Sequence, residues 1–111
     1  MSILEELNEI LSEILPIETG VFSDVAPEKY IVLTPMSDDF VLYGDDRPLI
    51  DLSEVRISVF IIGNYLTITK QIVNELLAAG FTMTSRRFIV HENDTGYNHY
   101  NIDVQKFYNH E

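Results

Sequence analysis

Residues 53–81 constrain the fold more than any other part of this chain. Branched apolar residues alternate with polar or aromatic ones at the start of the stretch: Val55, Ile57, Val59 and Ile61. This period of two predicts a strand with one buried face. Gly63-Asn64 then breaks the run, and Asn64 is a residue type that caps helices. The stretch therefore predicts a strand that turns directly into a helix.

Two amphipathic helices are expected. In the helix that follows this strand, Ile68, Ile72, Leu76 and Ala79 share one stripe, and Gly80 supplies a residue type that ends helices. The second helix is expected over residues 2–15, where apolar residues recur with the helical period. Ser2 followed by Glu5 matches a capping box, and Pro16 ends the pattern.

The remaining segments have the patterns of strands and turns. We expect strands over 21–22, 30–36, 40–43, 81–91 and 97–108, a turn at 37–39, an exposed loop over 44–48, a bulge at Arg86-Arg87 and a hairpin turn over 92–96. Short turns favour antiparallel pairing. The sequence therefore predicts a single α+β domain over residues 1–111, in the order α-β-β-β-α-β-β. Its mostly antiparallel sheet of four to five strands carries two helices packed on one face, and the other face is solvated or covered by a partner.

The charge balance excludes several classes of function. The 111 residues include 7 basic and 18 acidic ones, for a net charge of −11. Seven cations are too few for the basic stripe that a phosphate backbone requires, and an anionic membrane would repel the protein. The chain has no Cys and no apolar run that would span a bilayer, and its acidic N-terminal residues do not match a signal peptide. We expect synthesis in a cytoplasm.

Two groups of residues resemble catalytic or metal sites. Tyr43-Gly44-Asp45-Asp46 matches the metal-binding tetrapeptide of viral RNA polymerases, but the basic template channel is missing, so we interpret it as an acidic turn.

The second group is a set of metal-ligand types, His91, Glu92, Asp94, His99 and Asp103. On a strand, His99 and Asp103 would lie about 13 Å apart, too far to share an ion. His91 and His99 could approach each other across a hairpin, which leaves a weak site open. No nucleophile-and-base set is visible, so we expect no catalytic residue, no metal and no cofactor. An enzyme that uses His91, Asp94 and His99 remains a minor hypothesis.

Aromatic and cationic residues are the candidates for an interface. Tyr and Phe together number 12, and Tyr97, Tyr100, Phe107 and Tyr108 crowd the last expected strand. We expect Tyr100 to point into the core, whereas outward aromatic residues are typical anchors of interfaces. Arg47, Arg86 and Arg87 are rare cations on an acidic protein, and contacts with acidic neighbours in an oligomer are one interpretation of them.

The order of these features resembles the small tail-completion or tail-terminator (head–tail joining) proteins of long-tailed bacteriophages and prophages. The resemblance covers nearly the whole chain: the first helix, the strand that begins Tyr30-Ile31-Val32-Leu33, the 43–48 loop, Gly63-Asn64-Tyr65, Ala79-Gly80-Phe81 and the 94–99 segment. One departure is Tyr100, where members often carry a basic residue after the His.

The resemblance implies a structural protein of the virion tail rather than an enzyme. Such proteins form a hexameric ring at the head-proximal end of the tail, so the implied partners are further copies of the chain, the tail-tube protein and the head-connector protein. DNA passes through the ring without specific binding, and an acidic bore would repel its phosphates. The candidate subunit interface is Asp45, Asp46, Arg47, Arg86, Arg87, Tyr97 and His99.

An acidic DNA mimic that inhibits a host nucleic-acid-binding protein is the alternative. Its small size and charge fit equally well, but a mimic needs ordered rows of carboxylates, whereas this sequence interleaves them with apolar residues. Loss of binding to a basic host protein at moderate salt would favour it.

Overall fold

The computed structural model describes residues 2–18, 28–44 and 47–109. In chain order the elements are α1 (Ile3–Leu11), β1 (Ile17–Glu18), β2 (Lys29–Gly44), β3 (Arg47–Ile62), α2 (Leu66–Ala78), β4 (Thr82–His91) and β5 (Tyr97–Asn109). The expected α+β class is confirmed. The order of elements also agrees, although the strands before α2 are divided differently.

Within the described residues the strands form one sheet in the order β1-β2-β3-β5-β4. The short β1 runs parallel to β2, and the other neighbours are antiparallel. β1 occupies residues 17–18, whereas the strand expected at 21–22 lies outside the described residues. The sheet therefore ends at β4 on one side and at β1 and β2 on the other.

The turn expected at residues 37–39 is wrong, because β2 continues through it as one strand. Pairing with β3 is maintained by shifts of register between Pro35 and Ser37 and between Phe40 and Leu42. β1 pairs only with Ile31 and Val32, so the rest of β2 is an edge strand. Pro35 is tolerated there because a proline on the open side of an edge strand removes no hydrogen bond of the sheet.

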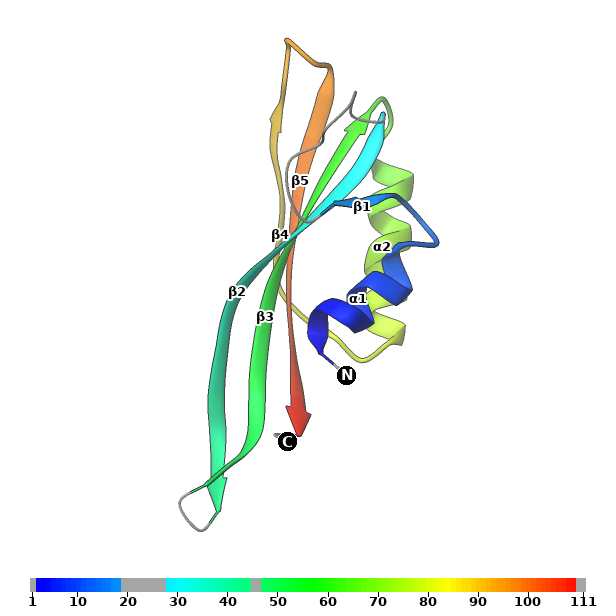
Figure 1. Ribbon diagram of the computed structural model, residues 1–111. Coiled ribbons are helices and arrows are strands. Elements are labelled where there is room, and N and C mark those ends of the chain that lie inside the picture. Colours follow the sequence, from blue (N-terminus) through cyan, green and yellow to red (C-terminus); the bar gives the residue numbers. More distant parts are fainter. Residues whose placement is uncertain (1, 19–27, 45–46, 110–111) are drawn as a thin grey trace.

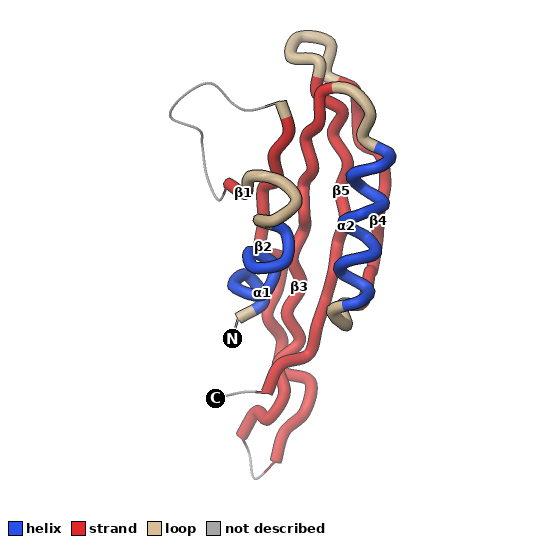
Figure 2. Tube along the Cα trace, turned by 90° about the vertical axis from the view of Figure 1, so that its right-hand side faces the viewer, coloured by secondary structure: helices blue, strands red, loops and turns tan. Residues whose placement is uncertain are grey.

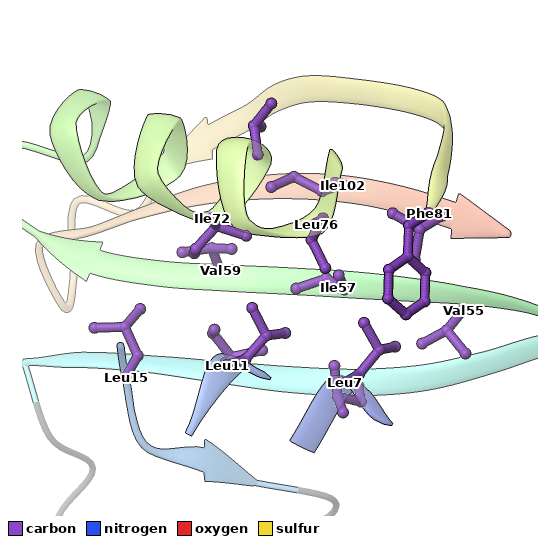
Figure 3. Packing of buried hydrophobic residues seen from close by; sticks show 14 of the residues in the cluster. Leu7, Leu11, Leu15, Val55, Ile57, Val59, Ile72, Leu76, Phe81 and Ile102 are labelled. Atoms are coloured by element: carbon purple, nitrogen blue, oxygen red, sulfur yellow. The ribbon is translucent and has the colours of Figure 1, made fainter. Parts of the chain in front are cut away.

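Both helices pack on the same face of the sheet, as predicted (Figure 2). Leu7 and Leu11 from α1 and Ile72 and Leu76 from α2 meet the inward residues of the sheet, which include Val55, Ile57, Val59 and Ile102 (Figure 3). Among the described residues eleven side chains are fully buried, namely Leu7, Leu11, Ile31, Val55, Ile57, Val59, Ile61, Ile72, Leu76, Ile102 and Val104. The alternation in β3 thus marks the face that the helices cover.

The predicted helix ends are mostly confirmed. The N–H of Glu5 donates to Ser2 Oγ (3.2 Å), and that hydroxyl donates to the Glu5 carboxylate (3.1 Å), which closes the capping box. At α2, Asn64 Oδ1 accepts from the N–H of Leu66 (3.0 Å), and Gly80 has a φ of 87°. α1 is shorter than expected because residues 12–15 form turns instead of a continued helix.

A partly buried cluster of polar contacts around Lys106 fastens both helices to β5. The Lys106 ammonium donates to Glu6 of α1 and to the carbonyl oxygen of Ala79 at the end of α2 (2.8 Å), and it lies 4.6 Å from the ring centroid of Phe81. Tyr108 also donates to Glu6 (2.8 Å). Burial opposes ionisation of Glu6, but the bonds from Lys106 and Tyr108 outweigh it and lower the pKa of Glu6.

The β2–β3 hairpin forms an arm that runs past the helices (Figure 1). β5 accompanies β3 only from the pair Ile50–Asn109, so the end of the arm has two strands. The molecule is 54 Å long but only 29 and 23 Å across, and its radius of gyration of 15.4 Å exceeds the value of about 13 Å typical of a compact domain of this length. The arm is the source of this elongation.

Candidate interaction surfaces

The seven candidate interface residues fall on three separate parts of the structure. Asp45 and Asp46 lie outside the described residues, between the two strands of the arm. Arg47 is the first residue of β3 and pairs with Gly44 of β2. The exposed loop expected over 44–48 is therefore wrong, because pairing of the strands continues to this point and leaves only residues 45 and 46 between them. Arg47 belongs to the end of the arm.

Tyr97 and His99 share the face of the sheet opposite the helices, here called the helix-free face. His99 stacks on Phe60 with ring centroids 4.3 Å apart, and Phe60 stacks on Tyr30 at 4.8 Å. Tyr97 meets Tyr30 edge-on at 5.4 Å and Phe60 at 6.2 Å. The four rings form an aromatic cluster that links β2, β3 and β5. Each such ring pair stabilises the fold by about 0.5–1.5 kcal/mol in addition to the burial of apolar surface.

Tyr30 and Phe60 were missed as members of this cluster. Phe60 occupies one of the outward positions in the alternation of β3, and that aromatic residue among polar ones was the available signal. Burial raises the pKa of the Tyr30 phenol, and the neighbouring Tyr97 and Glu92 add to the effect. The phenol of Tyr30 therefore stays neutral at physiological pH.

A row of polar side chains continues the helix-free face along β5. Arg56 of β3 binds Asp103 through two hydrogen bonds of 2.9 and 3.1 Å. The bond to Asp103 and its negative charge raise the pKa of Arg56. Nε2 of His99, in the aromatic cluster, and Oδ1 of the nearby Asn101 are buried and have no hydrogen-bond partner in the part of the chain that the structure describes. Two polar atoms of this face are therefore desolvated without compensation from the described residues.

Arg86 and Arg87 pair regularly with Ile102 and Asn101 of β5, so the bulge expected at these residues is wrong. The irregularities lie to either side, between Met83 and Ser85 and between Phe88 and Val90. Since Ile102 points toward the helices, Arg86 lies on the helix side of β4, and Arg87 lies on the helix-free face. Both side chains are exposed because β4 is an edge strand.

Arg86 borders an open hollow of about 370 Å³ between α2 and the sheet. The hollow is lined by Leu66, Thr69, Lys70, Val73, Arg86 and Tyr100. Ring contacts of Tyr65 with Phe88 (5.2 Å) and with Tyr100 (6.0 Å) close its end. Lys70, Arg86 and Arg87 form no ion pair within the described residues.

Several exposed apolar side chains belong to α2 and to β4, the strand beside it. Eight large hydrophobic residues are exposed in the described part of the chain, and five belong to α2 or β4, namely Leu66, Leu77, Phe88, Ile89 and Val90. Leu77 continues the stripe of Leu66, Lys70 and Val73 along α2. These five residues, together with Lys70, Arg86 and Arg87, are called the basic edge below.

The residue types considered as metal ligands do not converge. His91 Nδ1 lies 2.8 Å from Asn98 Oδ1 on the helix side of the sheet, whereas His99 lies on the other face. Asp103 is occupied by Arg56. Across the described residues no group of three or more His, Asp or Glu side chains could hold a metal ion.

No protein-family model matches the chain, and no curated protein sequence does either. Neither helix among the described residues has the length and apolar character needed to cross a bilayer.

Proposed function

We propose that the protein is a virion-assembly subunit of a long-tailed phage or prophage, of the tail-completion or tail-terminator type. In this proposal it is made in the host cytoplasm and then joins the tail, where copies form a hexameric ring at the head-proximal end. The ring binds the tail-tube protein on one side and the head connector on the other. The protein has no catalytic role.

The arm is the observation that carries this proposal. Beyond the pair Ile50–Asn109 the arm has only two strands, and an isolated two-stranded ribbon is only marginally stable in water, so we infer that a neighbouring molecule packs against this end. The arm's sequence includes the apolar run Phe40-Val41-Leu42-Tyr43, and apolar residues are common in surfaces that a partner covers. Subunits of an assembly commonly bury such surfaces only when they join it.

The helix-free face gives further support. It combines the aromatic cluster of Tyr30, Phe60, Tyr97 and His99 with buried polar atoms, and aromatic residues are the usual anchors of protein interfaces. The net charge of −11 suits a ring through which DNA slides, because carboxylates repel phosphates.

The test uses the phage or prophage genome that encodes the chain. Deletion of the gene should yield tails of uncontrolled length and heads without tails, seen by electron microscopy, and the wild-type gene supplied in trans should restore virions. Normal virions from the deletion would refute the proposal. Salt-sensitive binding to a basic host protein in the same cells would favour the DNA-mimic alternative.

A shortened variant tests the role of the arm. Asp38 and Ser53 are partners across β2 and β3, so a two-residue Asn-Gly turn can join them and remove residues 39–52. This variant keeps every apolar residue that is buried in the described core, yet it should fail to restore virions. The control Glu75→Gln changes an exposed carboxylate of α2 outside the arm and the candidate interface residues, and it should restore virions.

A further inference from the structure

The layer of helices stops short of the outer strand β4. Met83, near the start of β4, is half-buried against the core, but Arg86, Phe88 and His91 on the same side of the strand are exposed. α2 therefore leaves a strip of β4 uncovered along its own flank. The basic edge comprises that strip, the adjoining side of α2, and the exposed residues Arg87, Ile89 and Val90 of β4, of which Arg87 and Val90 lie on the helix-free face.

The cations of the basic edge differ from Arg56 and Lys106, although Lys29 of β2 also forms no ion pair among the described residues. Arg56 and Lys106 bind the carboxylates of Asp103 and Glu6. Lys70, Arg86 and Arg87 make no such pairs within the described residues, although the chain carries 18 acidic residues. A positive patch with exposed apolar residues on a protein of net charge −11 has the composition of a docking surface for an acidic partner.

The complementary surface lies at the other end of the same layer. α1 lies over β2 and β3, whereas α2 lies toward the β5 and β4 side of the sheet (Figure 2). The outward side of α1 and of the turn after it carries the exposed carboxylates of Glu5, Glu9 and Glu13. A second copy can lie beside the first with the β2 of the second copy next to the β4 of the first. The α1 of the second copy then lies beside the α2 of the first copy and over its uncovered strip of β4. The basic edge and the α1 side of the chain are thus opposite in charge, and both belong to the helix layer.

We propose that the basic edge of one copy binds the acidic α1 side of the next copy, in a head-to-tail contact. Because the two surfaces are different, a bound pair still has one free surface of each kind. The contact can therefore be repeated until it closes as a ring. The inference deepens the proposed function, which requires copies of the chain to associate. It concerns the purified protein alone and does not depend on a virion.

Charge-reversal variants of the two surfaces test the contact. Arg86→Glu/Arg87→Glu removes the basic edge but keeps α1, and Glu9→Lys/Glu13→Lys does the reverse without touching the capping box. Each should associate at least about tenfold more weakly than wild type in sedimentation velocity, since like charges replace opposite ones. Moderate salt should weaken the wild-type contact.

Mixing the two variants gives the sharpest result. The intact basic edge of Glu9→Lys/Glu13→Lys can bind the intact α1 of Arg86→Glu/Arg87→Glu, and the two altered surfaces are again opposite in charge to each other. An equimolar mixture should therefore associate at least about tenfold more strongly than either variant alone. The control Glu75→Lys/Asp94→Lys makes the same change of charge at exposed sites elsewhere and should associate within about threefold of wild type.

Three outcomes would overturn the inference: a wild-type protein that stays monomeric up to about 1 mM, self-association of Glu9→Lys/Glu13→Lys at wild-type strength, or folded variants whose mixture stays monomeric. Any of these leaves the virion experiment to be judged separately. Conversely, normal virions from the deleted genome would refute the tail function while the head-to-tail contact stood.

Discussion

Replacement of Lys106 by Met should destabilise the protein strongly, because one ammonium group holds three elements together. It donates to Glu6 of α1 and to Ala79 at the end of α2, and it lies over the ring of Phe81. A hydrogen bond between charged groups contributes about 1.5–3 kcal/mol, and a cation–π contact about 0.5–1 kcal/mol. Met retains part of the packing of the lysine stem, and both ion-pair partners keep about a fifth of their side-chain surface exposed, 23% for Lys106 and 20% for Glu6.

These contributions combine to a loss of about 2–3 kcal/mol after allowance for solvent screening. With an unfolding entropy of about 2.1 cal/mol/K per residue, 111 residues give about 0.23 kcal/mol/K, so Tm should fall by about 9–13 °C. Urea denaturation and calorimetry at neutral pH measure both quantities. A double-mutant cycle with Glu6→Gln should give a coupling energy of about 1 kcal/mol or more.

Lys70→Met is the matched control, since it removes the same charge from an exposed lysine that forms no ion pair in the described structure. It should change stability by less than about 0.5 kcal/mol. If Lys106→Met behaved like this control, the ammonium would not hold the helices to β5, and the explanation of how this small domain keeps its two layers together would be wrong.

Three further effects are expected. Because the pKa of Glu6 is lowered in the folded protein, its ionised carboxylate adds stability at pH values above the ordinary pKa of 4.5. This stability is lost as the pH falls through the lower folded pKa. Glu6→Gln should therefore flatten the acid side of a plot of the urea midpoint against pH. Arg56→Met should leave the buried carboxylate of Asp103 unpaired, and the double variant Arg56→Met/Asp103→Leu should unfold at higher urea than this single variant. Leu76→Ala should cost about 3 kcal/mol in chemical denaturation, whereas the same change at its exposed neighbour Leu77 should cost under about 0.5 kcal/mol.

The sequence predicted elements well where one face is buried along their whole length. Val55, Ile57, Val59 and Ile61 alternate because α1 and α2 cover that side of β3, and the same holds for Ile102 and Val104 of β5. β2 was divided in two because Ser37-Asp38-Asp39 has the composition of a turn. Pairing with β3 overrides that local preference, and the shifts of register absorb the extra residues.

The error at Arg86-Arg87 has a different cause. Two consecutive arginines interrupt an alternating pattern. A bulge would explain the interruption if one face of the strand were buried and the other exposed. β4 is instead exposed on both faces as an edge strand, so the pattern carries no information about register there. The aromatic cluster and the Lys106 contacts were unpredictable for a further reason: Tyr30 meets Tyr97, and Glu6 meets Lys106, only through the strand order β2-β3-β5 and the packing of α1.

The distribution of cations connects stability and assembly in this protein. Under the proposed head-to-tail contact, the cations of the basic edge that form no ion pair in the described chain belong to the surface that binds another copy. Lys106 and Arg56 lie where they join elements, and their loss should appear in unfolding experiments on the monomer. Lys70, Arg86 and Arg87 lie where a neighbour would bind, and their loss should appear only when copies meet. The two sets of variants thus separate the forces that build the subunit from those that would join it to the next.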